Sequence, residues 1–144
     1  PKSWKMFRIT ITKPDDWHIH LRDGDMLDRT VNDVAAWANR AVIMPNLSPP
    51  VLTVADATAY HSRILSALSK APDFEPLMTL YLTDNTTPQD IREAAASPLV
   101  CGVKLYPAGA TTNSDSGVTS AQKIYHCTAQ RVRLLCGVLT LVYF

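Results

Sequence analysis

Positions 15–23 read Asp-Asp-Trp-His-Ile-His-Leu-Arg-Asp and are the most informative stretch of the chain. Side chains two apart on a β-strand point to the same face, so His18, His20 and Arg22 are predicted to share one face. The two histidine Cα atoms would lie about 6.7 Å apart, which lets both imidazoles bind one metal ion. Arg22 could hold an anionic substrate through two parallel hydrogen bonds. A half-buried strand whose polar face happens to carry two histidines is the competing explanation, and the arginine in phase favours the metal site.

The composition sets the class of protein. The 144 residues suffice for one ordinary domain, and the hydrophobic fraction of 47% is typical of a globular protein. A net charge of +1 gives no electrostatic reason to expect a nucleic acid or a membrane as partner. The longest apolar stretch is shorter than the roughly 20 residues that a transmembrane helix needs. The three cysteines lack the spacing of a metal finger, so we expect buried thiols in a reducing cytoplasm.

Strand-like and helix-like segments alternate along the chain. The predicted strands cover residues 7–12, 17–21, 40–44, 76–83, 99–106 and 134–144. The predicted helices cover residues 26–39 and the segments that begin with the capping residues Thr53, Thr87 and Thr119. This alternation predicts an α/β protein built from parallel βαβ units.

Two architectures fit parallel βαβ units, namely a doubly wound sheet and a (β/α)8 TIM-type barrel. No glycine-rich phosphate loop follows the first strand, which counts against a dinucleotide-binding sheet. His18, His20, Asn46 and Lys104 all lie at or after strand ends, where barrel enzymes build their sites. A complete barrel takes about 250 residues. We therefore expect a partial barrel of about four to five βα units with open strand edges.

Lys104 lies within an apolar strand, where an isolated ammonium is costly to bury. Three explanations are open. The lysine pairs with a buried acid, it forms a Schiff base through an amine of lowered pKa, or it has captured carbon dioxide as a carbamate that bridges two metal ions. The two histidines on another strand make the third explanation competitive with the first.

Four ordered segments carry a resemblance to a known family. Residues 14–25 resemble the first-strand signature of dihydroorotase, the single-domain bacterial and plant type. Residues 41–51, 76–83 and 103–114 resemble the second, third and fourth strand segments of that family. The resemblance covers about residues 7–125, so it is far more specific than an isolated His-X-His.

The resemblance implies an amidohydrolase-superfamily barrel with two zinc ions. Such an enzyme converts N-carbamoyl-L-aspartate reversibly to L-dihydroorotate in pyrimidine biosynthesis. By position, His18 and His20 would bind the more buried zinc, and Lys104, as N6-carboxylysine, would bridge the two ions. Two zincs would polarise the amide carbonyl and lower the pKa of a bridging water toward 7.

The resemblance also implies where the substrate binds. Arg22 and Asn46 would hold its carboxylate, although an asparagine after a strand is more often a turn residue. Thr111 and Thr112 would lie on a loop that closes over the substrate. A hydantoinase or an allantoinase is the runner-up, and the pair Arg22 and Asn46 favours dihydroorotase because its substrate has an added carboxylate.

The resemblance ends near His126. The later metal histidines and the aspartate that serves as general base have no counterpart, so no catalytic residue is identified. We expect one incomplete hydrolase domain over residues 1–144 with a divergent tail from residue 126, nearly inactive as it stands. Dimerisation through open strand edges is also expected. A non-catalytic half-barrel that docks on another protein is the alternative from a different class.

Overall fold

A computed structural model describes residues 7–69, 71–110, 112–128 and 134–136. Its strands are β1 (Asp16–Ile19), β2 (Arg40–Ile43), β3 (Glu75–Leu82), β4 (Val100–Leu105) and β5 (Leu134–Cys136). Its helices are the 3-10 turn η1 (Gly24–Met26) and α1 (Leu27–Ala35), α2 (Val54–Ala67), α3 (Pro88–Ala96) and α4 (Ala121–Thr128). Neighbouring strands pair in parallel in the order β1-β2-β3-β4-β5. This sequential order, without a reversal point, is that of a barrel rather than of a doubly wound sheet.

Local sequence explains where two of the helices begin. Thr53 and Thr87 each accept a hydrogen bond from the backbone N–H three residues on. Asp56 and Asp90 each accept a hydrogen bond from the backbone N–H of the capping residue, which completes a capping box at both predicted capping residues. Pro88 occupies the first turn of α3, where its missing N–H costs nothing.

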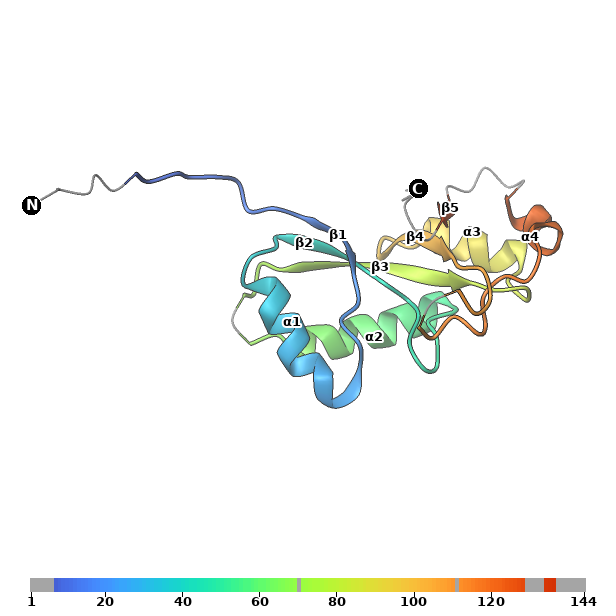
Figure 1. Cartoon of the computed structure of the whole chain (residues 1–144), viewed down its shortest axis with the longest axis horizontal. Helices are drawn as coiled ribbons and strands as arrows, with labels where there is room; N and C mark the ends of the chain where they lie inside the picture. The colour runs from blue at the N-terminus through green and yellow to red at the C-terminus, as the bar shows by residue number, and fades with distance from the viewer. Residues whose placement is uncertain (1–6, 70, 111, 129–133, 137–144) are drawn as a thin grey trace, which may run out of the picture.

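The two faces of the sheet have different surroundings. Ile43, Leu80 and Val103 belong to the hydrophobic core shared with the helices, and Figure 1 shows α1 and α2 together below the sheet. Because side chains alternate along a strand, Met44 and Lys104 lie on the opposite face. Both residues are at least 98% buried, so this face is covered at the ends of β2 and β4, whereas His18 of β1 is exposed.

The N-terminal strand prediction is wrong. Residues 7–12 extend away from the sheet (Figure 1) and form no strand. The alternating residues Phe7, Ile9 and Ile11 are 76–87% exposed. An apolar alternation predicts a half-buried strand only where another strand offers hydrogen bonds, and the described part of the chain places none beside this segment.

The first strand also ends earlier than predicted, at Ile19. Arg22 has a φ of 64°, which is left-handed rather than extended backbone. The prediction that Arg22 continues the strand face of His18 is therefore wrong. Arg22 instead lies in a turn between β1 and η1.

Asp84 joins the end of β3 to the start of α4. Its carboxylate accepts hydrogen bonds from the backbone N–H of Thr119 (2.9 Å), the Thr119 hydroxyl (2.7 Å) and Lys123 Nζ (2.7 Å). The predicted capping box at Thr119 is wrong for this reason. The hydroxyl of Ser120, the residue directly before α4, accepts the Gln122 N–H instead.

These contacts predict a pH dependence. The Lys123 ammonium and the Thr119 donors lower the pKa of Asp84 to about 2, whereas an unfolded aspartate titrates near 3.9. Because the folded pKa is the lower one, the stabilisation is present above about pH 4 and is lost as the pH falls toward about 2. We expect Asp84→Asn to reduce the slope of unfolding free energy against pH in this window. Urea titrations at several pH values measure it, and an unchanged slope contradicts the assignment.

Candidate metal centre

Two histidines meet at the end of β1. His18 lies in the strand and His20 follows directly after it, and their Nε2 atoms are 3.3 Å apart. Two nitrogen ligands of a tetrahedral zinc, each about 2.0–2.1 Å from the metal, lie about 3.3 Å apart. The pair therefore has the spacing of two ligands on one metal ion.

The protonation state of the pair also suits a metal. Burial, followed by the charge of Lys104, lowers the pKa of His18. Burial lowers the pKa of His20 to about 4, and the neighbouring His18 and Arg22 add to the effect. His20 is therefore neutral at pH 7, and the shift of His18 is in the same direction, toward the neutral imidazole. Neutral imidazole is the form that binds a metal, so little free energy is spent on removing protons.

Lys104 joins this pair from β4. Its Nζ lies 3.2 Å from His18 Nε2 and 3.3 Å from His18 Nδ1. Since it is nearly equidistant from both ring nitrogens, the contact is not a directed hydrogen bond to one of them. The same Nζ lies 3.0 Å from Met44 Sδ and 4.7 Å from the centre of the Tyr106 ring. The fold thus brings His18, His20 and Lys104 together, as the sequence predicted.

Asn46 connects the loops that follow β2 and β4. It is 98% buried. Its Oδ1 accepts a hydrogen bond from the Tyr106 hydroxyl (3.3 Å), and its Nδ2 donates to the Thr112 carbonyl (3.0 Å). Thr112 thus contacts Asn46 through its backbone, while Thr111 lies outside the described residues. Asn46 is therefore more than a turn residue, because its side chain holds the second loop next to the histidine end of the sheet.

Arg22 lies close enough to the site for its charge to act on it. The guanidinium contributes to the lowered pKa of His20 and opposes the burial that raises the pKa of Tyr106 to about 12. The charge of Arg22 thus acts on His20 and on Tyr106, and the Tyr106 hydroxyl in turn binds Asn46. A positive group and a buried amide beside a pair of neutral imidazoles can bind a metal and an anionic ligand together.

Sequence reasoning missed Tyr81. This β3 residue pairs in register with Lys104, and its ring lies 5.5 Å from that of Tyr106. Its hydroxyl is buried and has no hydrogen-bond partner among the described residues, although buried tyrosine hydroxyls usually have one. The alternation of Thr79, Tyr81 and Thr83 within an apolar strand was the available signal for a polar inner face.

The described residues do not supply the ligands of a second metal ion. Among them, no group of three or more His, Cys, Asp and Glu side chains is placed to hold a metal. His61 lies on α2 and carries no predicted role. The described residues therefore identify neither the ligands of a second metal ion nor a general base.

The comparisons with known proteins agree with this geometry. The family model for the amidohydrolase family matches residues 11–131. The chain belongs to the amidohydrolase family. Over 115 residues it is 64% identical to the dihydroorotase of Ralstonia nicotianae, and over 120 residues 62% identical to that of Vibrio cholerae. These alignments cover 80% and 83% of this chain but 33% and 35% of the relatives, so the chain spans about a third of their length.

Solved structures confirm the prediction of a partial barrel. A Campylobacter jejuni dihydroorotase structure matches with a TM-score of 0.73 and 38% identity, over 86% of this chain and 37% of the other. A Saccharomyces cerevisiae dihydroorotase in complex with 5-fluoroorotic acid matches with a TM-score of 0.75 and 34% identity, over 85% and 34% of the two chains. An Arthrobacter aurescens L-hydantoinase matches at 0.62 with 16% identity, over 80% and 26%, and shares the fold alone. The described residues include no helix long and apolar enough to cross a membrane.

Proposed function

We propose that this chain provides the histidine pair, the bridging lysine and the carboxylate-binding residues of a dihydroorotase. The enzyme would convert N-carbamoyl-L-aspartate reversibly to L-dihydroorotate and water in cytoplasmic pyrimidine (UMP) biosynthesis. The observation that carries the proposal is the meeting of His18, His20 and Lys104 at one end of the sheet. The identity of 64% to a dihydroorotase over 115 residues supports the choice of substrate.

The geometry of the histidine pair supports the proposed metal ligands. His18 and His20 would hold one zinc through their neutral imidazoles, and Lys104, as N6-carboxylysine, would bridge it to a second. Bound zinc would polarise the ring carbonyl and lower the pKa of a water molecule. A carbamate replaces a buried cation by an anion, and such a change suits a side chain next to two metal ions.

The substrate-binding residues act on the carboxylate of the ring. Arg22 would donate two N–H groups to it, and Asn46 Nδ2 would share a donor that now contacts the Thr112 carbonyl. When the substrate binds, Asn46 would therefore give up its contact with the Thr112 carbonyl. The loop that carries Thr111 and Thr112 would then contact the substrate in place of Asn46. This exchange would couple substrate binding to loop closure, which keeps water away from the reacting amide.

The chain by itself is proposed to be nearly inactive. Two histidines and a carbamate leave the second zinc with the bridge and water alone. A general base typically contributes 10²–10⁴-fold in rate, and no residue of the resembling region is assigned to that role.

Size-exclusion chromatography with light scattering tests the associated proposal of a homodimer, and also the alternative of a non-catalytic half-barrel that docks on another protein.

The proposal is tested with a full-length enzyme in which residues 7–125 of this chain replace the matching part of the Ralstonia nicotianae relative. We expect hydrolysis of dihydroorotate to exceed that of hydantoin and allantoin. Preference for hydantoin would overturn the choice of substrate. Elemental analysis of the purified 144-residue chain is expected to show less than two zincs, and two tightly bound zincs with ordinary turnover would contradict the account of the incomplete site.

A further inference from the structure

The turn after β1 has an unusual backbone conformation at one residue. Arg22 has a φ of 64°, a left-handed conformation that residues with a side chain seldom adopt. Gly24, two residues on, has a φ of 61°, which glycine adopts without cost. A left-handed arginine persists only where its surroundings hold it. The contacts of this turn should therefore explain the conformation of Arg22.

Tyr60 of α2 makes the first of these contacts. Its hydroxyl donates a hydrogen bond to the Arg22 carbonyl, and the whole side chain is buried. This bond joins residues 38 positions apart. Burial raises the pKa of Tyr60, so the hydroxyl stays protonated and remains a donor. The bond fixes the direction of the Arg22 carbonyl, and with it the orientation of the peptide plane after Arg22.

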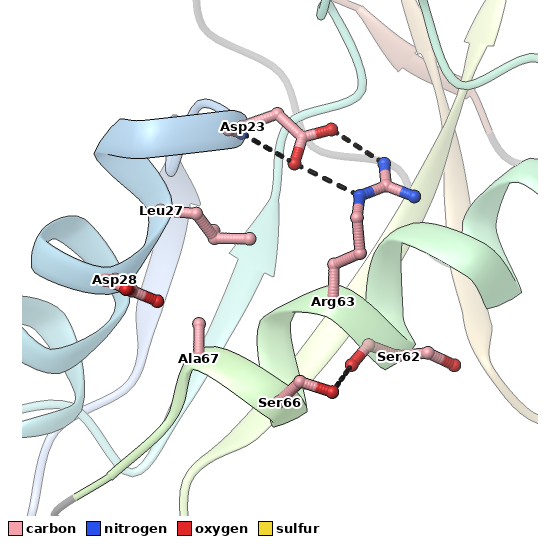
Figure 2. Close-up of a pocket in the computed structure, with 8 residues that line it drawn as sticks. Asp23, Leu27, Asp28, Ser62, Arg63, Ser66 and Ala67 are labelled. Atoms are coloured by element: carbon pink, nitrogen blue, oxygen red, sulfur yellow. Dashed lines mark hydrogen bonds and ion pairs between the residues drawn. The ribbon is translucent and has the colours of Figure 1, made fainter.

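Arg63, one helical turn further along α2, makes the second contact. Figure 2 shows its guanidinium reaching across a surface pocket to the Asp23 carboxylate. Two parallel bonds join them, from Nε to Oδ1 at 3.1 Å and from Nη2 to Oδ2 at 2.7 Å. Asp23 Oδ1 also accepts the Gly24 N–H at 3.0 Å, and the Arg63 guanidinium lies 5.3 Å from the centre of the Tyr60 ring.

We propose that Tyr60 and Arg63 are positioning residues that hold the Arg22 turn, so that the Arg22 guanidinium is presented to the substrate carboxylate. This inference rests on the proposed function. Two side chains of α2 hold two consecutive residues of the turn. Tyr60 fixes the carbonyl of Arg22, and Arg63 fixes the carboxylate of Asp23. Without them the turn can relax toward ordinary backbone angles and carry the Arg22 side chain away from His20.

Kinetics of the full-length enzyme described above test this inference, with Tyr60→Phe and Arg63→Gln as variants. Tyr60→Phe keeps the buried ring and removes only the hydroxyl. We expect either variant to raise KM for dihydroorotate by roughly 10-fold with a smaller change in kcat, because a group misplaced by about 1 Å can cost up to 10²-fold. Arg63→Lys should fall between, since a lysine cannot make two parallel bonds. Arg29→Gln removes an exposed helix ion pair and is the matched control.

A double-mutant cycle shows whether the two residues act through Arg22. In an Arg22→Met background, Tyr60→Phe and Arg63→Gln should have no further effect on KM, because the group that they position is gone. Effects that multiply with that of Arg22→Met would overturn the inference, as would variants that lower kcat and leave KM unchanged. If the parent enzyme does not hydrolyse dihydroorotate, the proposed function fails first. Amide hydrogen exchange at Asp23 and Gly24 in the 144-residue chain then still tests whether Tyr60 and Arg63 hold the turn. Tyr60→Phe and Arg63→Gln should speed this exchange, and Arg29→Gln should not.

Discussion

Replacing His18 by alanine in the full-length enzyme is expected to lower kcat/KM for dihydroorotate by about 10³-fold or more. In the proposed enzyme, bound zinc would supply several kcal/mol of charge stabilisation in the transition state, and each 1.36 kcal/mol is a factor of ten in rate. His18 is the residue whose ring touches both other candidate ligands, with His20 at 3.3 Å and Lys104 at 3.2 Å. Its loss should therefore release the metal as well as reduce the rate, which elemental analysis of the same sample measures.

His61→Ala is the control for this change. His61 is a half-buried histidine of α2, and burial lowers its pKa as it does for His18. It differs from His18 in lying outside the metal centre, so its replacement should leave zinc content and rate unchanged. Equal losses in both variants would show that the effect comes from folding, and a His18→Ala enzyme that keeps its zinc would contradict the ligand assignment.

The sequence predicts those parts of the fold that depend on local chemistry. Thr53 and Thr87 start helices because each lies three residues before an aspartate that completes a capping box. Thr119 resembles them locally, but Asp84 binds its hydroxyl and its N–H from 35 residues away. The apolar alternation of Phe7, Ile9 and Ile11 likewise predicts a strand that also needs a neighbouring strand. In both cases the outcome depends on a partner that spacing does not specify.

The candidate site likewise has features that the sequence predicts and features that depend on tertiary contacts. The spacing of His18 and His20 and the position of Lys104 in an apolar strand are visible in the sequence, and the fold brings these three residues together. The backbone angle of Arg22 and its link to Tyr60 are not visible in the sequence, because they arise from contacts between the turn after β1 and α2. Tyr81 is recognisable only once β3 and β4 are in register, which places it opposite Lys104.

Leu82→Ala is expected to destabilise the chain by about 2–5 kcal/mol, the usual cost of truncating a fully buried leucine. Leu82 ends the central strand β3, is fully buried, and belongs to the core that the sheet shares with the helices. A domain of this size typically has about 5–15 kcal/mol of stability in total. One substitution on the helix-facing side of β3 should therefore remove a large part of it, visible as a lower urea midpoint with an unchanged m-value.

Leu65→Ala separates burial from residue type. Leu65 lies on α2 and is 45% exposed, so the same substitution there should change the unfolding free energy by only about 0.5 kcal/mol. If the two variants have equal midpoints, the packing between β3 and the helices does not hold the chain together. If Leu82→Ala alone shifts the midpoint, these βα units have a native core. Such a core is the physical condition under which Lys104 of β4 can be held 3.2 Å from the Nε2 atom of His18, which lies 86 residues earlier in β1.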